Sequence, residues 1–493
     1  MQIGFDNSKY IEMQAQHIRD RIAQYGEKLY LEFGGKLFDD YHASRVLPGF
    51  EPDSKVRMLA NLKDDAEIVI AINANDIEKS KRRADIDITY DEDALRIMDG
   101  FKGMGLYVGS VVITHFTGQS NAITFQSRLE QMGIKVYRHY IIEGYPANID
   151  AIVSEEGFGK NDYIETSRPL VVVTAPGPGS GKLATCLSQL YHENKRGIRA
   201  GYAKFETFPV WSLPLKHPVN IAYEAATADL DDRNIIDPFH LEAYGKVTVN
   251  YNRDVESFPV LKAVMDRILG ECPYQSPTDM GVNMVGMCIS DDKVCQKAAQ
   301  NEIVRRYFHA AEKFQRTGLG ESEIAKINLL MKEADVTVDF SPAHQAALDK
   351  EESTGKPAAA MVLPDGSLVT GKTSALLGCA SSLLLNALKR VAGVPKEIYV
   401  VSDKALAPIG HLKTEYLGSK NPHLHPDETL IALSISSATN PLAAKAIEAA
   451  KELKGCDAYF SVIISESDEA IFKRLGINVC CEPKFERHVL YHR

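Results

Sequence analysis

The chain has 493 residues, more than one hydrophobic core usually supports, so we expect it to fold as several domains. With 45% hydrophobic and 25% charged residues it has the composition of a globular protein, and no apolar run approaches the ~18 residues of a membrane span. The net charge of −10 disfavours non-specific binding to nucleic acid or to an anionic membrane, so we expect neither as a partner.

Eight cysteines are spread along the chain without any C-x-x-C pair. This spacing suits neither a structural zinc site nor a disulfide framework, and it favours reduced thiols in the cytosol. The first residues lack the basic and apolar segments of a signal peptide. We therefore expect a cytoplasmic protein, and we expect it to be a homo-oligomer.

Residues 1–255 alternate between apolar runs and amphipathic stretches. The runs are rich in Val and Ile and are bounded by turn residues, which is typical of strands covered on both faces. Residues 121–132 carry apolar side chains at helical spacing. The pattern predicts an N-terminal α/β domain with a layered sheet. The expected strands are residues 28–33, 67–72, 110–114, 135–142, 170–174, 198–205 and 246–250.

In residues 256–350 strand patterns nearly vanish, and the segment predicts a helical subdomain with helices at 260–269, 293–315 and 321–333. Residues 351–493 predict a C-terminal α/β domain. It begins with a hairpin at 358–370 around the turn Pro364-Asp-Gly366. The further elements expected are a helix at 375–391, a strand at 397–402, helices near 409–417 and 441–453, a strand at 458–464 and a short strand near 479.

The most informative motif is Thr174-Ala-Pro-Gly-Pro-Gly-Ser-Gly-Lys182, which joins an expected strand to an expected helix. Glycine tolerates the positive φ that lets neighbouring N–H groups point the same way. The N-terminus of a helix adds unpaired N–H groups and the positive end of a dipole. This P-loop-like strand-loop-helix therefore predicts a phosphate or nucleotide site. Its expected ligands are Gly177, Gly179, Ser180, Gly181 and Lys182.

The motif departs from the P-loop pattern G-x-x-x-x-G-K-[ST] at two positions. Pro176 replaces the first glycine, and Leu183 replaces the Ser or Thr whose hydroxyl normally ligates Mg²⁺. Thr185 lies about 200° round the helix from Leu183 and does not substitute for it. The differences favour phosphate binding over Mg-dependent hydrolysis. The alternative is a plain strand-to-helix turn with an exposed lysine.

A second stretch, Gly366-Ser-Leu-Val-Thr-Gly-Lys-Thr373, matches the P-loop pattern letter for letter. Its β-branched middle prefers a strand, so we interpret it as the returning strand of the hairpin. Gly371, Lys372 and Thr373 remain a candidate secondary anion site, because we place them at the start of a helix.

Gly34, Gly35 and Lys36 directly follow an expected strand and predict a second wall of the phosphate site. The alternative is a tight turn followed by a solvated charged face. The nearby charged residues with a candidate metal or phosphate role are Asp39, Asp40 and Arg45.

Residues 203–229 form an extended segment with several prolines, the only tryptophan and many ionisable side chains. Loops at the strand ends of α/β scaffolds are where substrate sites assemble. The alternative is a packed surface loop. We expect Lys204, at the end of the strand that follows the glycine motif, to face the same crevice. The candidate catalytic residues are Lys204, Glu206, His217 and Asp229, and further candidates follow at 237–242 and 250–254.

His423 and His425, with Glu428 nearby, have a spacing that could seat a metal ion on a strand. Prolines at 422 and 426 indicate a loop instead, and no third histidine follows at a regular interval. We therefore assign no metal site.

Several of these stretches resemble a family of uncharacterised bacterial proteins of about this length, over the whole chain. The resemblance is carried by Gly4–Tyr10, Glu32–Lys36, His42–Phe50, Thr174–Lys182, Lys216–Asn220, Thr370–Ser374 and His425–Glu428. The C-terminal domain is also similar to the cytidine-deaminase scaffold of hairpin, helix, strand, helix and strand. It lacks the zinc motif P-C-x-x-C, so the resemblance implies no zinc chemistry.

The sequence predicts a nucleotide- or phosphate-binding enzyme that acts on a small phosphate-bearing metabolite. A kinase- or ligase-like user of ATP, with Mg²⁺, fits the glycine motif best. One alternative is a nucleotide or phosphometabolite sensor without hydrolysis. The other is a structural or assembly protein in which the glycines serve only as turns.

Overall fold

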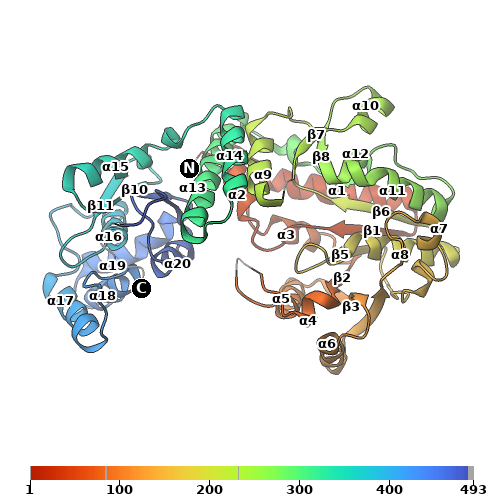
Figure 1. Cartoon of the computed structure of the whole chain (residues 1–493), viewed down its shortest axis with the longest axis horizontal. Helices are drawn as coiled ribbons and strands as arrows, with labels where there is room; N and C mark the ends of the chain where they lie inside the picture. The colour runs from red at the N-terminus through yellow and green to blue at the C-terminus, as the bar shows by residue number, and fades with distance from the viewer. Residues whose placement is uncertain (1, 84–85, 231, 487–493) are drawn as a thin grey trace. The chain divides into compact units, whose positions relative to one another are not determined.

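In the computed structural model, residues 2–83, 86–230 and 232–486 are described, and the chain forms two compact units. The sheet unit comprises residues 3–223 and 232–296, and the C-terminal unit comprises residues 297–486 with residue 2 and residues 224–230. Each unit has its own β-sheet surrounded by helices (Figure 1). The expected multidomain α/β class is confirmed, while boundaries at 255 and 350 stay a prediction.

Among the described residues, the sheet unit is built on a seven-stranded sheet in which all paired strands are parallel. The strand order is β4-β3-β2-β5-β1-β6-β9. The strands are β1 (Lys28–Phe33), β2 (Ala66–Asn73), β3 (Tyr107–Phe116), β4 (Lys135–Tyr140), β5 (Leu170–Thr174), β6 (Ala200–Phe205) and β9 (Gly281–Val282). A separate antiparallel pair is made by β7 (Asn234–Ile236) and β8 (Val249–Tyr251).

Most of these strands lie where their Val- and Ile-rich runs predicted them. All five residues of β5 are buried, as expected for a parallel strand covered on both faces. The helices around the sheet are α1 (Asn7–Tyr25), α2 (Tyr41–Val46), α3 (Ser54–Ala60), α4 (Ala74–Glu78), α5 (Tyr90–Gly103), α6 (Ser120–Gln131), α7 (Ile149–Ile152), α8 (Lys182–Lys195), α9 (Pro218–Ala226), α10 (Pro238–Tyr244), α11 (Asn252–Leu269) and α12 (Pro277–Met280).

The order of the strands creates a reversal between β5 and β1. The connection from β1 to β2 crosses over β5 toward one edge of the sheet. The connection from β5 to β6 crosses over β1 toward the opposite edge. Ligands of open α/β sheets bind at such a reversal, outside the carboxyl ends of the strands. The segments that follow β1, β5 and β6 therefore lie where a ligand of this sheet is expected to bind.

Helices α8 and α11 pack together on one face of this region (Figure 1). Their buried side chains join those of β1 and β6 in one hydrophobic core that includes Tyr30, Leu190, Tyr202 and Phe258. The side chains of β1 and β6 alternate between the two faces, so the residues after Tyr30 and Tyr202 that share this face are Glu32 and Lys204. Both lie at the carboxyl ends of their strands.

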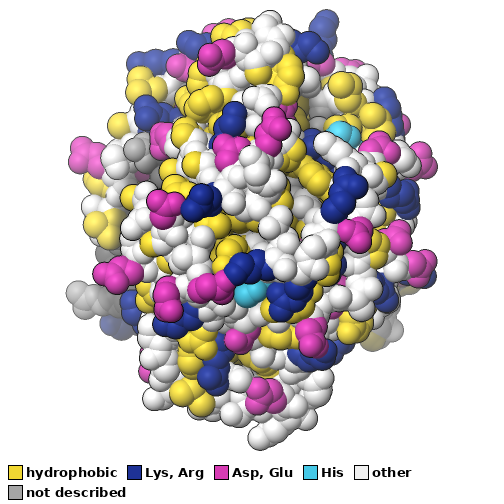
Figure 2. Space-filling model, turned by 90° about the vertical axis from the view of Figure 1, so that its right-hand side faces the viewer, with side chains coloured by type: hydrophobic (Ala, Val, Ile, Leu, Met, Phe, Trp, Pro, Cys, Tyr) yellow, Lys and Arg dark blue, Asp and Glu magenta, His cyan; other side chains and the backbone are white. Residues whose placement is uncertain are grey.

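On the face drawn in Figure 2, positive and negative side chains of the described residues are interspersed with apolar ones. No broad area of a single sign is seen there. This is the surface expected of a chain whose net charge is only moderately negative.

The C-terminal unit has a four-stranded sheet in the order β11-β10-β12-β13. The predicted hairpin is present as the antiparallel pair β10 (Ala358–Val362) and β11 (Leu368–Lys372), and β12 (Asp457–Phe460) runs parallel to β13 (Asn478–Cys481). The helices are α13 (Asp292–Thr317), α14 (Glu321–Glu333), α15 (Pro342–Thr354), α16 (Cys379–Val391), α17 (Asp403–His411), α18 (Pro426–Ser437), α19 (Pro441–Glu448) and α20 (Glu466–Arg474).

Two sequence predictions for this unit are wrong. Residues 397–402 are irregular and form no strand, although Val400 and Val401 are buried in the core of the unit. A short apolar run is equally compatible with a buried loop. The helix expected from residue 375 begins at Cys379, and α18 and α20 were not predicted.

Candidate functional site

The glycine loop, residues 175–181, connects β5 to α8 as predicted. Gly179 and Gly181 have φ of 73° and 80°, whereas Ser180 between them does not have a positive φ. Alternation of left- and right-handed residues turns successive N–H groups toward a common point and forms an anion-binding concavity. Gly181 is also the N-cap of α8, so the helix dipole adds to the same point.

Three carbonyl groups of the glycine loop are held by protein donors. Ser180 Oγ donates to Gly177 O at 2.5 Å, Asn73 Nδ2 donates to Gly179 O at 3.1 Å and Thr114 Oγ1 donates to Ser180 O at 2.8 Å. Asn73 and Thr114 come from the ends of β2 and β3. The loop is thereby fixed through its carbonyl side, by its own Ser180 and by residues near the ends of the neighbouring strands β2 and β3.

The amide side of the same loop has no such partners. Within the described residues, the N–H groups of Gly179, Ser180, Gly181 and Lys182 donate no hydrogen bond. The Lys182 side chain is half-buried and likewise makes no ion pair there. Four consecutive amides and an ammonium group are thus available to an anion at the start of α8.

Position 183 explains why the loop departs from the P-loop pattern. Leu183 packs against the hydrophobic core shared by α8 and the sheet. The Thr185 side chain is fully buried, and its hydroxyl has no hydrogen-bond partner among the described residues. A Ser or Thr at position 183 would therefore lose the contact that the Leu183 side chain makes with the hydrophobic core.

One residue near the end of β3 was not predicted as part of the site. His115, at the end of β3, has a φ of 53°, a conformation that is strained for a residue with a Cβ atom. Its Nδ1 lies 3.2 Å from Thr114 Oγ1, the hydroxyl that holds the carbonyl of Ser180. Strained residues of this kind concentrate at functional sites. No residue pattern in the sequence marks His115.

Gly34 and Gly35 follow β1, which lies beside β5 in the sheet. Gly35 has a φ of 77°, and a Cβ atom there would be 3.2 Å from the Lys55 ammonium group. Lys55, which the sequence did not single out, is buried and forms a 2.6 Å ion pair with Asp40. Lys36 is exposed. The structure thus places a second ammonium group, that of Lys55, beside the Gly-Gly turn.

Asp40 has two structural roles that account for its charge. Its Oδ1 accepts the N–H of Ala43 at the start of α2, and its Oδ2 pairs with Lys55. Burial alone would raise the pKa of Asp40, but Lys55 and the amide of Ala43 outweigh burial and lower it. The Asp40 carboxylate is therefore ionised, and both of its oxygens already have a protein partner.

At the end of β6, Lys204 is surrounded by acidic side chains, and we call Lys204 with Glu206, Asp254 and Glu32 the lysine cluster. The Lys204 ammonium lies 3.1 Å from Glu206 Oε1 and also pairs with Asp254 in the first turn of α11. Glu32 on β1 is directly opposite Lys204 in the parallel register. Tyr202 donates a 2.8 Å hydrogen bond to Glu32 Oε2. Three acids thus share one lysine.

Burial and mutual charge shift the pKa values of the cluster. Burial would lower the pKa of Lys204, but Asp254, Glu206 and Glu32 raise it well above its ordinary range. Burial raises the pKa of Glu206 to about 8, with Lys204 opposing and Asp254 adding to the shift. Burial would raise the pKa of Asp254, but Lys204 holds it below its ordinary value. Near pH 7 the cluster therefore contains a protonated Glu206 beside an ionised Asp254.

Aromatic side chains line the region of the lysine cluster. The Lys204 ammonium lies 6.0 Å from the centre of the Tyr251 ring, and the edge of Tyr223 contacts that ring. Phe208 stacks on Tyr223 with ring centres 5.6 Å apart. Trp211 lies over Gly281, where a Cβ atom would be 2.2 Å from the indole ring. The cluster is therefore partly enclosed.

The other two candidate catalytic residues have different surroundings. His217 is buried, and its Nε2 lies 3.0 Å from Asp292 Oδ1 while its Nδ1 accepts the N–H of Val219. Burial lowers the pKa of His217, although Asp292 acts in the opposite direction. Asp229 is exposed on a short 3₁₀ turn, Ala228–Leu230, of the C-terminal unit. Their contacts assign neither residue to the lysine cluster.

The candidate secondary anion site at Gly371, Lys372 and Thr373 does not stand at a helix start, and this premise of the prediction is wrong. Strand β11 continues to Lys372, and α16 begins only at Cys379. A Cβ atom at Gly371 would be 2.3 Å from the backbone N of Leu383 in α16. The glycine is thus explained by close packing of strand and helix.

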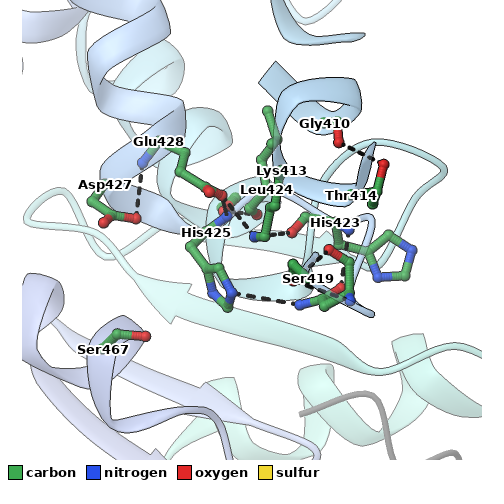
Figure 3. A network of polar contacts seen from close by, with 12 residues as sticks. Gly410, Lys413, Thr414, Ser419, His423, Leu424, His425, Asp427, Glu428 and Ser467 are labelled. Carbon is green, nitrogen blue, oxygen red and sulfur yellow. Dashed lines mark hydrogen bonds and ion pairs between the residues drawn. The ribbon is translucent and has the colours of Figure 1, made fainter. Parts of the chain in front are cut away.

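The histidines before α18 belong to a polar network around Lys413 (Figure 3). The buried Lys413 ammonium donates to His423 O and to Glu428 Oε2, each at 2.9 Å. His425 Nδ1 lies 2.6 Å from Asp468 Oδ1, and this contact, opposed by burial, raises the pKa of His425. Glu428 also accepts the N–H of His425. Lys413 thus compensates the charge of Glu428, while Asp468 is the carboxylate that contacts the His425 ring.

Among residues 2–83, 86–230 and 232–486, no three His, Cys, Asp or Glu side chains are grouped so as to hold a metal ion. In the same part of the chain, no helix is long and apolar enough to cross a membrane. A surface cavity of about 600 Å³ is lined by residues of α1 and by Asn61, and includes no residue of the glycine loop or lysine cluster.

Comparison with known proteins identifies the family. Residues 3–335 match the family described as "Domain of unknown function DUF1846, N-terminal", and residues 339–491 match its C-terminal counterpart. A UPF0371 protein of Corynebacterium urealyticum is 56% identical over 492 residues, which cover 100% of this chain and 99% of the relative. A UPF0371 protein of Streptococcus sanguinis is 54% identical over 491 residues, with the same shares. The resemblance to a bacterial family is confirmed, and the chain belongs to the UPF0371 family of DUF1846 proteins.

Proposed function

We propose that the chain is an enzyme that binds a nucleotide or another phosphate-bearing small molecule at the carboxyl edge of its parallel sheet. In this proposal the glycine loop and Lys182 hold the phosphate, and the lysine cluster faces the remainder of the ligand. A kinase- or ligase-like reaction that uses ATP is the form of activity we favour. Gly34 and Gly35 form the adjoining wall.

One observation carries the proposal: four consecutive amides at the N-terminus of α8, from Gly179 to Lys182, have no hydrogen-bond partner in the described part of the chain. Phosphate oxygens accept hydrogen bonds only, so this set of donors is complementary to them. The three loop carbonyls, which would repel a phosphate, are turned to protein donors. A loop that served only as a turn would not need to have its carbonyl groups hydrogen-bonded and its amide groups left open.

The place of the glycine loop in the fold supports the same proposal. It follows β5 at the reversal of the strand order, where ligands of open α/β sheets bind. Lys204 lies on β6, two strands from β5 and separated from it only by β1. A phosphate at the loop and a reacting group at Lys204 would be about 10 Å apart at the usual strand spacing.

Isothermal titration with ATP, GTP, sugar phosphates and inorganic phosphate, with and without Mg²⁺, tests the proposal. We expect saturable binding of at least one of these ligands. Lys182→Ala should weaken it by about 10- to 100-fold, the value of a lost charge-assisted hydrogen bond. Gly181→Ala should weaken it as well, because φ is 80° there and a Cβ atom would lie 3.2 Å from Thr114.

Lys195→Ala is the matched control, since Lys195 stands at the other end of α8 and pairs with Glu155 at the surface. It should leave the affinity unchanged. Turnover of a phosphate ester or of ATP in the presence of a small-molecule acceptor would identify the enzyme. Absence of binding by every phosphate ligand would refute the proposal.

A second candidate function is a nucleotide or phosphometabolite sensor that does not hydrolyse its ligand. The observation that favours it is Leu183, whose side chain packs in the core at the position where a P-loop hydroxyl ligates Mg²⁺. Tight binding that is independent of Mg²⁺ and without turnover would select the sensor. We further propose a cytoplasmic location, consistent with cysteines that are all free and buried, and a homo-oligomeric state.

A further inference from the structure

Three buried polar atoms that follow β6 lack a hydrogen-bond partner of ordinary donor–acceptor type among the described residues: Glu206 Oε2, Thr207 Oγ1 and Trp211 Nε1. Glu206 Oε2 and the Trp211 ring both adjoin Gly281 of β9. When it is protonated, Glu206 also hydrogen-bonds Asp254. The Glu206 side chain is 9% exposed, so water at the surface does not readily satisfy it. Leaving such an atom unsatisfied costs about 1–3 kcal/mol, and native structures rarely do so without a reason. A carboxyl oxygen and an indole N–H together suit a ligand group that both donates and accepts.

The charges of the lysine cluster narrow the chemistry of that group. An anionic ligand group at this place would be repelled, because the two negative charges of Asp254 and Glu32 exceed the single positive charge of Lys204. A cation would compete with the Lys204 ammonium, which already lies between Glu206 and Asp254. A neutral hydroxyl group meets neither difficulty. It donates to a carboxylate and accepts from a protonated carboxyl or an ammonium group.

Glu32 connects the lysine cluster to the glycine loop. It lies on β1 between β5 and β6, and its charge acts both on Lys204 and on Cys186 in the second turn of α8. Lys182 acts on Cys186 too. The strand order places β1 alone between β5 and β6, so the ends of the strands that lead to the two sets of groups are about 10 Å apart at the usual spacing of strands. A phosphorylated pentose or hexose bridges such a distance.

The surrounding rings fit the same ligand. Tyr251 and Trp211 present aromatic surface beside the lysine cluster, and Gly281 allows the indole to approach Glu206. Small-molecule sites commonly combine aromatic walls with a few polar groups that fix orientation. The C–H face of a sugar ring packs on such walls while its hydroxyls reach the polar groups.

We infer that the ligand is a phosphorylated polyol, whose phosphate binds the glycine loop and whose hydroxyl groups bind Glu206 and Asp254 of the lysine cluster. The inference rests on the proposed function and specifies its substrate class. The polyol is a free sugar phosphate or the ribose of a nucleotide. Both sources present the same chemistry, a phosphate about two strand spacings from a group of hydroxyls.

Titration of the full-length chain with four probes tests the inference: inorganic phosphate, ribose 5-phosphate, glucose 6-phosphate and AMP. We expect at least one phosphorylated polyol to bind 10-fold or more tightly than inorganic phosphate. Glu206→Gln should remove most of that gain and leave the affinity for inorganic phosphate unchanged. Lys182→Ala should weaken the binding of phosphate and of the polyol phosphate alike.

Glu271→Gln, at an exposed glutamate just after α11 in the same unit, is the matched control and should change nothing. Asp254→Asn provides a second variant should Glu206→Gln fail to fold, which thermal unfolding reveals. Tighter binding of AMP than of ribose 5-phosphate assigns the polyol to a nucleotide, and the reverse assigns it to a free sugar; both support the inference.

Failure of the polyol inference and failure of the proposed function give different results. If inorganic phosphate binds as tightly as every phosphorylated polyol, or if Glu206→Gln weakens both equally, the inference is wrong while the phosphate site stands. If none of the four probes and no nucleoside triphosphate binds, the proposed function itself is wrong.

Discussion

Lys204 is the residue around which the charges of the candidate site are arranged. Its ammonium group compensates Asp254 and lies beside Glu206 and Glu32 in a partly enclosed region. Removing one partner of a buried charge pair leaves the other uncompensated and is costly. The geometry therefore makes Lys204 a structural centre as well as a candidate binding group. Glu206 is the better residue at which to separate the two roles.

Glu206 should make stability depend on pH in a defined direction. Its pKa is about 8 in the folded chain, above the ordinary value of 4.5 that it regains on unfolding. Between these values the folded state holds a proton that the unfolded state lacks, so stability falls as pH rises from about 5 to 8. Glu206→Gln lacks this proton. Relative to the unsubstituted chain, the variant should therefore gain stability over that interval.

Urea unfolding at pH 5.5, 7 and 8.5 measures this difference. Lys204 and Asp254 face the carboxyl group, and their charges are common to both proteins. The exposed control Glu271→Gln should show a difference that is independent of pH. The same flat profile for Glu206→Gln would contradict the assignment of a protonated carboxyl group.

Lys413 offers a residue-scale test in the C-terminal unit. Its buried ammonium group holds Glu428 and the carbonyl of His423 (Figure 3). Lys413→Met should reduce the free energy of unfolding by about 2 kcal/mol, because both acceptors lose a charged donor. Chemical denaturation measures the loss. Lys420→Met, at a nearby exposed lysine, should be neutral, and an equal loss in both variants would argue against the network.

Among the elements, β5 with its glycine loop and α8 forms the part of the fold most directly suited to a function. The strand is fully buried, the loop carbonyls are anchored on β2 and β3, and the helix covers β1 and β6. The hairpin β10–β11 shows the opposite case. Its sequence matches the P-loop pattern, yet the pattern falls on a strand, because Ser-Leu-Val-Thr is strand-forming and Gly371 packs on α16.

Gly371→Ala tests this packing at the scale of two elements. The new Cβ atom would be 2.3 Å from the backbone N of Leu383, and backbone cannot yield as a flexible side chain does. We expect a loss of about 3 kcal/mol, the upper part of the range for overpacking. Thermal or urea unfolding measures it. Gly410→Ala in α17, where the nearest atom would be at 3.5 Å, should be neutral or slightly stabilising; a similar neutrality at position 371 would contradict the contact.

At the scale of the whole molecule, each unit has its own sheet and its own core, and thiols are buried in both. All eight cysteines are free and buried. Burial raises the pKa of several of them, including Cys186 and Cys379. A buried thiol with a raised pKa is a poor nucleophile.

The native chain should therefore react slowly with a thiol reagent, and eight thiols should react once it is unfolded. A reducing agent should leave the thermal midpoint unchanged, because no disulfide is present among the described residues. Spectrophotometric titration before and after denaturation measures both. Rapid reaction of even one thiol in the native chain would contradict the burial described.

Much of the sheet unit could be predicted from the sequence, because its evidence is local. Short apolar runs located β1 and β5 to the residue, and the glycine loop was recognised by glycines that need positive φ. The prediction of a strand at 397–402 was wrong because strand pairing, unlike burial, depends on residues far away in the chain. The apolar residues of this segment are buried as predicted, but burial can be satisfied without pairing, and no neighbouring strand accepts them.

By itself the sequence determined the α/β class, the strand-loop-helix around Gly177–Lys182 and the candidate residues Lys204 and Glu206, since each depends on residues close together in the chain. Only the tertiary structure decided that β5 lies between β1 and β2, that Asp254 comes to Lys204 across 50 residues, and that His115 and Lys55 stand beside the two glycine turns. The physical reason is that strand order and side-chain encounters arise from the sum of many long-range contacts, which no local pattern encodes.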